Sequence, residues 1–359
     1  MVLFFLCQFC YYRYIFIIFG GYILKKEGKR AIDVVIDSFL KRVKSTGEMP
    51  WQNPHSFGVS INWVSKKMYR GINRILLPNG EYMTKNQLNK YNEEHGTDFR
   101  FQKGIVWFPV VFYSGVERRL DSEEIEKIFG GKGLPVGDVI FDSRGSRVWG
   151  TEKGYFTEVL VLRYSLVAEI RHFKDSKGNT LPRRIGDDTS FDLQITKEEP
   201  QKVIDDYIKR SGISYEEIDD GKSYYMPSRD LVHVNKNYRW SEAKYSTTFH
   251  ELAHSTGHAN RLDRDGITKN YTFGSEGYAF EECVAEIASS LLCQETGVDT
   301  FVTSGTESYD NSASYVSHWS EYIKDNSNKF VSICKKAEQA YLYILGYSED
   351  SQLRGKDSR

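Results

Sequence analysis

The sequence predicts a two-domain α+β protein, and three observations support this class. The chain has 359 residues, more than one domain of about 100 to 200 residues holds. Short runs typical of strands dominate the first half, and longer helical patterns dominate the second. The halves also differ in charge, with 21 Lys and Arg against 15 Asp and Glu over residues 25–150, and 26 against 34 over residues 151–359.

The composition excludes several classes of protein. A hydrophobic fraction of 40% with 27% charged residues is typical of a folded globular protein, and not of a disordered, collagenous or polytopic membrane protein. The five cysteines are odd in number and unevenly spaced, which does not fit a disulfide framework. They indicate a reducing compartment, so we expect the protein in the cytoplasm.

Residues 3–24 are almost wholly apolar or aromatic, interrupted by Gln8 and Arg13. This run is long enough to span a bilayer, but an arginine in mid-span costs about 2.5–3.5 kcal/mol on insertion scales. The basic flank Lys25, Lys26, Lys29 and Arg30 would keep the following residues in the cytoplasm. Two interpretations of residues 1–24 stay open, a membrane anchor that tethers the protein and a peripheral apolar leader.

The first half is expected to open with an amphipathic helix over residues 31–44, whose apolar residues recur at helical spacing. Runs bounded by Gly, Pro and Asn then predict strands of one sheet. Pro109 places the third strand at a sheet edge or a bulge, because proline cannot donate to a strand ladder. The four predicted strands are residues 58–64, 72–77, 105–113 and 155–164.

Between these strands, Thr84 and Gln87 have capping-box spacing and Gly96 supplies a stop, which predicts a helix over residues 84–95. The polar, Gly-rich residues 121–147 predict an insertion or loop, and residues 175–182 predict another. We place the junction between the two domains within residues 167–195.

The second half begins with two short strands in residues 224–234, on either side of a turn at residues 227–230. A helix follows, with Ser241 as its N-cap and Gly257 just past its end. Further helices are expected over residues 278–293 and 312–345, the last with an interruption near Asn326.

The segment His250-Glu251-Leu252-Ala253-His254 has the pattern H-E-x-x-H. On a helix the two histidines lie one turn apart on the same face, so both imidazoles can bind one ion while Glu251 leans toward a water. The alternative is a surface helix with two incidental histidines. With eight histidines in the chain, the pattern arises by chance in on the order of one per cent of sequences.

A catalytic zinc usually takes three protein ligands and keeps one position for water. Asn260 stands where a metzincin would have its third histidine, so we look to the acids of the next helix, Glu281, Glu282 and Glu286. We assign Glu282 as the third ligand and Glu286 as the carboxylate behind it, which accepts a hydrogen bond from a ligand histidine. The reverse order of these two stays open.

These residues predict hydrolysis of an amide bond. Zinc lowers the pKa of a bound water toward about 7 and polarises a carbonyl. Glu251 is the expected catalytic residue, because it can take the proton of the water and pass it to the leaving amine.

The first half also interleaves cations with aromatic residues. This combination binds single strands of nucleic acid, because bases stack on aromatic faces for about 1–3 kcal/mol each while cations follow the backbone. Ordinary packing of aromatic residues in a sheet is the alternative. The candidate DNA-binding residues are Trp63, Lys66, Lys67, Tyr69, Arg70, Arg74, Lys103 and Trp107.

Over residues 32–345 the chain resembles the ArdC antirestriction proteins of mobile elements, together with the TraC primase-associated proteins that share their N-terminal region. The most specific segments in the second half are residues 224–230, 249–262 and 281–286. Those in the first half are residues 50–54 and 69–73, and the Lys103-Gly104 turn before the strand that carries Pro109.

This resemblance implies a single-stranded-DNA-binding domain over residues 31–167 and a zincin-like metallopeptidase domain of the gluzincin type over residues 195–347. It also implies protection of incoming plasmid DNA from restriction. The metal motif of the family carries over onto His250, Glu251 and His254, and its acidic helix onto Glu282 and Glu286. Residues 1–24 and the long passage 121–147 depart from the family pattern, so the DNA-binding face can differ.

We therefore expect a DNA-binding module that delivers a zinc peptidase domain to proteins engaged with that DNA, such as restriction proteins. The chief alternative is a DNA-coating protein whose zinc site is structural or idle. A third interpretation is a membrane-anchored peptidase without a role at DNA.

Overall fold

The structure is a computed structural model. It describes residues 30–52, 59–130, 136, 139–141, 147–183, 199–269, 275–298, 317 and 319–347. All helices and strands below belong to the unit Ala31–Arg359. The apolar leader or anchor predicted for residues 1–24 lies outside the described residues. Among the described helices, none combines the length and the apolarity that a bilayer crossing requires.

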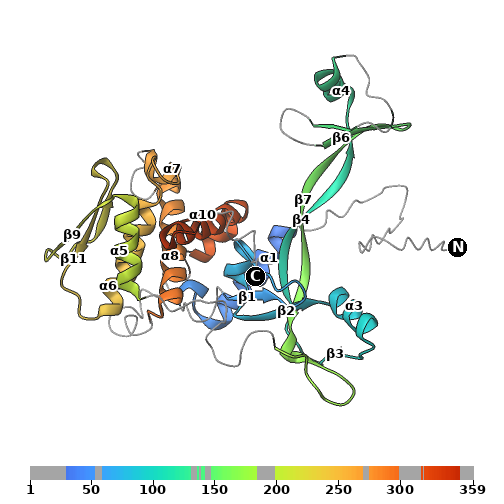
Figure 1. The fold of residues 1–359 in the computed structure, drawn as a ribbon, viewed down its shortest axis with the longest axis horizontal. Helices are drawn as coiled ribbons and strands as arrows, with labels where there is room; N and C mark the ends of the chain where they lie inside the picture. Colours follow the sequence, from blue (N-terminus) through green and yellow to red (C-terminus); the bar gives the residue numbers. More distant parts are fainter. Residues whose placement is uncertain are drawn as a thin grey trace, which may run out of the picture. The chain divides into compact units, whose positions relative to one another are not determined.

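The predicted α+β class is confirmed, and a six-stranded sheet forms the centre of the first half (Figure 1). Its strands run in the order β1 (Ser60–Asn62), β2 (Gly80–Thr84), β7 (Gly154–Glu169), β6 (Arg147–Thr151) and β5 (Val139–Phe141), and β4 (Phe108–Arg119) pairs with β7. Strands β1 and β2 are parallel, and the other pairs are antiparallel. β3 (Arg100–Phe101) and β8 (Phe173–Lys174) form a separate small ribbon.

The long ribbon of β4 and β7 confirms the expectation for Pro109. Pairing runs without a break from Phe108 opposite Val167 to Arg119 opposite Phe156, and β7 is the strand with which β4 pairs in this sheet. On its other side, the side chain of Asn73 donates to the carbonyl oxygen of Val111 at 2.7 Å and accepts from its N–H at 2.8 Å. An amide side chain therefore satisfies the edge where a further strand would pair.

Residues 72–77 are not a strand, and this prediction was wrong. They form helix α2 (Ile72–Leu76), which buries Ile72, Ile75 and Leu76. A short apolar run fits either a buried strand or one helical turn, and here the positions 72, 75 and 76 share one helical face. The strand that pairs in the sheet is β2, in which four of five residues are buried.

Two helices of the first half each begin with a capping box. At the start of α3 (Lys85–His95), the side chain of Thr84 accepts from the N–H of Gln87 at 3.1 Å, and Oε1 of Gln87 accepts from the N–H of Thr84 at 2.9 Å. Asp121 caps α4 (Ser122–Phe129) in the same way. Residues 121–147, expected as a loop, thus contain a helix and β5, while residues 131–135 and 142–146 lie outside the described residues.

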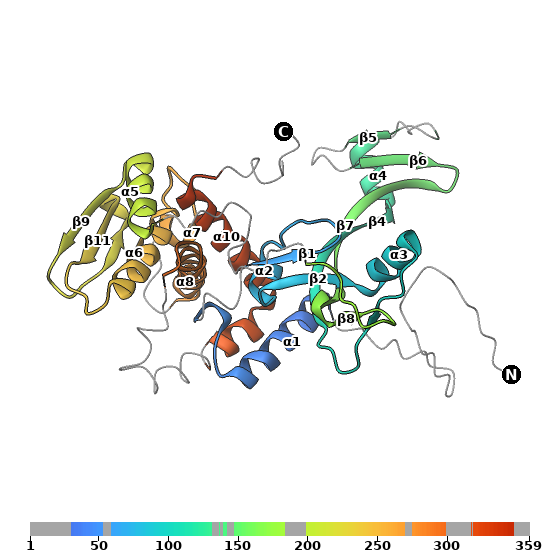
Figure 2. The same ribbon diagram turned by 60° about the horizontal axis from the view of Figure 1, so that its bottom comes forward.

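The second half places a three-stranded sheet beside a group of helices (Figures 1 and 2). Strand β11 (Leu231–Asn235) is antiparallel to β10 (Tyr224–Met226) and parallel to β9 (Ser214–Ile218). This confirms the two strands predicted around the turn at residues 227–230. The helices are α5 (Pro200–Ser211), α6 (Ser241–Ser255), α7 (Asp265–Thr268), α8 (Glu276–Thr296) and α10 (Ser327–Leu345), and residues 319–325 are also helical.

The main hydrophobic core combines residues from both halves of the chain. Helix α1 (Ala31–Thr46), Trp51 and α2 contribute side chains to the same cluster as α5, α6, α8 and α10. Polar contacts reinforce this joint, since Ser290 donates to the carbonyl oxygen of Trp51 and the N–H of Gly71 donates to Glu338 at 3.0 Å. The boundaries proposed from sequence, residues 31–167 and 195–347, remain a prediction.

Candidate metal centre

Helix α6 presents the H-E-x-x-H motif. The helix begins at Ser241 with Trp240 as its N-cap, one residue earlier than expected. The rings of His250 and His254 lie 4.7 Å apart, centroid to centroid. Their Nε2 atoms are 3.1 Å apart, so both imidazoles point to one place, as the four-residue spacing predicts.

Glu282 of α8 completes a set of three ligands. Its Oε2 lies 3.5 Å from Nε2 of His250, and its Oε1 lies 3.5 Å from Nε2 of His254. One ligand atom from each of the three residues can be chosen so that all lie within 4.8 Å of one another. Among the described side chains, this is the group of His, Cys, Asp and Glu that can hold a metal ion.

The donor set fits a divalent metal ion. Two imidazole nitrogens and one carboxylate are the ligands of many zinc sites. Bonds of about 2.0–2.2 Å in a tetrahedron separate ligand atoms by about 3.3–3.6 Å, close to the separations found here. Burial lowers the pKa of His250, but the hydrogen bond to Glu282 and the charges of Glu286 and Glu251 raise it to about 9. The site therefore attracts positive charge.

Glu251 follows the first ligand and is buried, with 8% of its surface exposed. Its charge contributes to the raised pKa of His250. It also acts on Tyr278 of α8, whose pKa is raised to about 12 by burial first, and then by Glu282 and Glu251. Glu251 thus lies close enough to His250 and Tyr278 for its charge to act on both.

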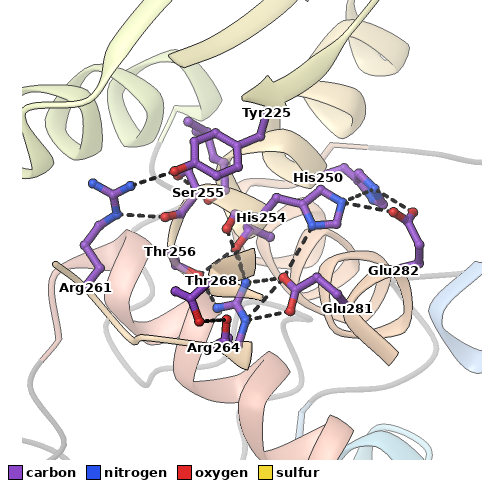
Figure 3. A network of polar contacts seen from close by, with 12 residues as sticks. Tyr225, His250, His254, Ser255, Thr256, Arg261, Arg264, Thr268, Glu281 and Glu282 are labelled. Atoms are coloured by element: carbon purple, nitrogen blue, oxygen red, sulfur yellow. Dashed lines mark hydrogen bonds and ion pairs between the residues drawn. The ribbon is translucent and has the colours of Figure 1, made fainter. Parts of the chain in front are cut away.

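A second acid, Glu281, lies behind His254 (Figure 3). Its Oε1 is 3.4 Å from Nδ1 of His254, and the guanidinium of Arg264 binds both of its oxygens. Burial raises the pKa of Glu281, but His254 and Arg264 hold it below its ordinary value.

Glu281 therefore accepts a hydrogen bond from the ligand His254, the kind of role that sequence reasoning gave to Glu286. Glu286 acts on His250 through its charge, and its assignment as the supporting carboxylate remains a prediction. Sequence reasoning missed Arg264 because no motif connects it to the site.

A further network secures the end of α6. Arg261 donates to Asp230 at 2.9 Å and to the carbonyl oxygen of Ser255 at 2.7 Å. The hydroxyl of Tyr225 donates to Asp230 at 2.8 Å, and Tyr207 bonds the side chain of Ser255 at 2.8 Å. The strand β10, the turn after it and the end of α6 are therefore joined next to the ligands. Figure 3 shows Arg261 bonded to both Tyr225 and Ser255.

Of the eight candidate DNA-binding residues, two are buried and six reach the surface. Trp63 is 1% exposed, and its Nε1 donates to the carbonyl oxygen of Pro182 at 2.9 Å. Arg74 is 4% exposed, with Glu338 at 3.5 Å and the ring of Tyr341 at 4.7 Å. Both are corrections, because a side chain buried in the core cannot contact a DNA strand.

The other six candidates reach the surface to different degrees. Tyr69 and Trp107 are partly exposed, and Trp107 packs on Phe101 with ring centroids 4.7 Å apart. The cations are exposed, namely Lys66, Lys67, Arg70 and Lys103. Their role at DNA remains a prediction.

A cleft of about 520 Å³ includes one of these cations, Arg70, and is also lined by Tyr69 and Phe112. The amides of Asn62 and Gln87, which also line it, hold each other through two hydrogen bonds of 3.3 Å. Phe112 is 44% exposed. Its position in a strand gave no signal from sequence, because an aromatic residue there is more often a packing residue.

The site and a family comparison together define the class. Residues 202–336 match the family of zincin-like metallopeptidases. The second half of this chain thus contains a zincin-like domain, and its donor set is one that divalent metals use.

Over about nine-tenths of its length the chain is ArdC-like in fold, as predicted. The crystal structure of the antirestriction ArdC protein from plasmid R388 in its metal-free form aligns with a TM-score of 0.56 at 20% identity, over 89% of this chain and 99% of that one. The Mn(II)-bound structure of the same protein gives 0.55 at 20% identity, over 90% and 99%.

Sequence relatives cover much of the chain. Two Escherichia coli proteins named DNA primase TraC are 28% identical over 332 residues and 24% identical over 322 residues. Each alignment covers 88% of this chain but 20% and 27% of the primases, so the chain spans about a quarter of their length or less. The uncharacterized protein y4eC of Sinorhizobium fredii is 29% identical over 36% of this chain and 40% of its own.

The burial of Arg74 yields a testable prediction. Arg74→Met should lower the free energy of unfolding by about 3–5 kcal/mol, because removing one partner of a buried ion pair leaves the other charge uncompensated. Well below its unfolding midpoint, the variant should bind a single-stranded oligonucleotide as the parent does. Urea unfolding and fluorescence anisotropy measure these two quantities.

Arg70→Gln is the matched control for the unfolding measurement alone, since the side chain of Arg70 is 41% exposed and also faces Glu338. It should change the unfolding free energy by less than about 1 kcal/mol. An Arg74→Met protein of parental stability with tenfold weaker DNA binding would contradict the structural role.

Proposed function

We propose that this protein is a single-stranded-DNA-binding, antirestriction-type protein with a zinc-dependent peptidase activity in its second half. One observation carries the peptidase part, the convergence of His250, His254 and Glu282 within 4.8 Å of one another. Glu251, buried beside the first of them, supplies the group that such a site needs for hydrolysis.

His250, His254 and Glu282 would hold the zinc ion. When bound, zinc supplies positive charge that acidifies water and polarises a peptide carbonyl. Glu251 accepts the proton of the attacking water and delivers it to the nitrogen of the leaving group. Burial of Glu251 keeps this carboxylate away from bulk water, which favours proton transfer to and from the substrate.

Single-stranded DNA is the proposed partner of the first half. The exposed cations Lys66, Lys67, Arg70 and Lys103 lie in a segment of net positive charge and can follow a phosphate backbone. The cleft of Tyr69 and Phe112 beside Arg70 can take an unstacked base. The relatives support this proposal, because one is named antirestriction protein and two are named DNA primase.

Glu251→Gln tests whether the metal site is catalytic. The variant should keep one equivalent of zinc and the parental DNA affinity, and should hydrolyse fluorescein-labelled casein at least about 100-fold more slowly, the usual effect of losing a general base. Glu242→Gln, which changes a partly exposed acid in the first turn of the same helix, is the matched control and should retain full activity.

The same two variants also test whether DNA protection depends on catalysis or on coating of the DNA. If Glu251→Gln protects DNA from a restriction endonuclease as well as the parent does, the metal site is idle for protection. That outcome favours a protein that coats DNA without proteolysis.

Phe112→Ala tests the cleft as a base-binding site. Loss of one stacking partner should weaken binding of an oligo-dT strand by about 5- to 150-fold, equivalent to about 1–3 kcal/mol. Tyr113→Ala is the control, because its side chain is 63% exposed and points to the opposite face of β4. Anisotropy titrations at two salt concentrations measure both, and equal effects of the two variants would exclude the cleft.

A further inference from the structure

Arg264 connects the metal-binding helix to the acidic helix. The residue is 2% exposed and precedes α7. Its Nε donates to Oε2 of Glu281 at 3.0 Å, and its Nη2 donates to Oε1 of the same carboxylate at 2.5 Å. Nη2 also donates to the carbonyl oxygen of Ala253 at 2.7 Å, and Nη1 donates to the hydroxyl of Thr256 at 2.6 Å. One guanidinium therefore holds the last turn of α6 against α8 (Figure 3).

The last turn of α6 is also the turn that carries His254. Glu281, fixed by two bonds to Arg264, presents Oε1 at 3.4 Å from Nδ1 of His254. A carboxylate can only accept a hydrogen bond, so it selects the tautomer of His254 with the proton on Nδ1. Nε2 then carries the lone pair and points toward Glu282 and His250.

Two glycines provide the space for this arrangement. A Cβ at Gly266 would lie 2.7 Å from Cβ of Glu281 and 2.8 Å from its Oε2. A Cβ at Gly257 would lie 2.6 Å from Ile267 and 3.0 Å from Nη2 of Arg264. A larger residue at Gly266 would therefore have to displace Glu281, and one at Gly257 would have to displace Ile267 and Arg264.

We propose that Arg264 is a positioning residue for the metal centre, acting through Glu281 on the orientation and tautomer of His254. This inference rests on the proposed metal-binding function. The neighbouring pair of Arg261 and Asp230 secures the same stretch of chain through Ser255. The Arg261–Asp230 pair makes no described contact with the ring of a ligand histidine. Variants of this pair therefore show how much zinc affinity is lost when the structure is weakened without any change in the positioning of His254.

The test compares two double variants of the full chain. Arg264→Met/Glu281→Met removes both charges at nearly constant volume, which a buried ion pair often tolerates. Its affinity for Zn(II), measured in competition with a chromophoric chelator, should fall by about 10- to 100-fold, the usual effect of removing an outer partner of a ligand. Arg261→Met/Asp230→Asn should stay within about threefold of the parent.

A second measurement covers the case in which the double variant does not fold. NMR spectra of Zn(II)-loaded parent protein with ¹⁵N-labelled histidines should show that His254 is protonated at Nδ1. Arg264→Lys keeps the charge but loses the paired bonds to Glu281. It should show weaker zinc binding and a faster exchange of the Nδ1 proton.

The results of these measurements distinguish a positioning role of Arg264 from a structural one. Loss of affinity in the Arg264/Glu281 variant alone supports the positioning role. Equal loss in both double variants, or parental affinity and an unchanged Nδ1 proton in the Arg264 variants, overturns it. A parent that binds no Zn(II) contradicts the metal function itself, which is a different failure.

Discussion

The packing of α6 against α8 is the constraint on which the rest of this structure depends. Phe249, Leu252 and Ala253 of α6 share a core with Val284 and Ala288 of α8, and all five are fully buried. Their apolar contacts fix the distance between the helices. The polar residues that alternate with them, His250 and His254 on one side and Glu281 and Glu282 on the other, meet because that distance is fixed.

Burying so many ionisable groups requires that each has a partner. Glu281 and Arg264 are among the most buried charged residues of the described chain, and an isolated charge there would cost several kcal/mol. Two adjacent residues of α8 have different partners. Glu281 faces Nδ1 of His254, and Glu282 faces the Nε2 atoms of His250 and His254. The imidazole of His254 thus has a carboxylate next to each of its two nitrogens.

Much of the fold and site could be predicted from sequence, because the signals were local. The H-E-x-x-H spacing, the caps at Thr84 and Gly96 and the turn at residues 227–230 each depend on neighbours within a few residues. The failures were tertiary. Residues 72–76 became helical because α2 packs onto α10, and the same packing took Arg74 out of reach of DNA. Glu281 and Arg264 could not be connected, since their 17-residue separation has no periodic meaning.

Metal content per chain tests the central claim most directly, because the proposed site draws ligands from both helices. Elemental analysis of the purified parent should give about one zinc per chain, and both His250→Ala and Glu282→Ala should give well below half of that. His258→Ala, a histidine just past α6 that bonds the N–H of Asn260, should keep the parental content. Full zinc content in His250→Ala or Glu282→Ala would contradict a metal centre shared by α6 and α8.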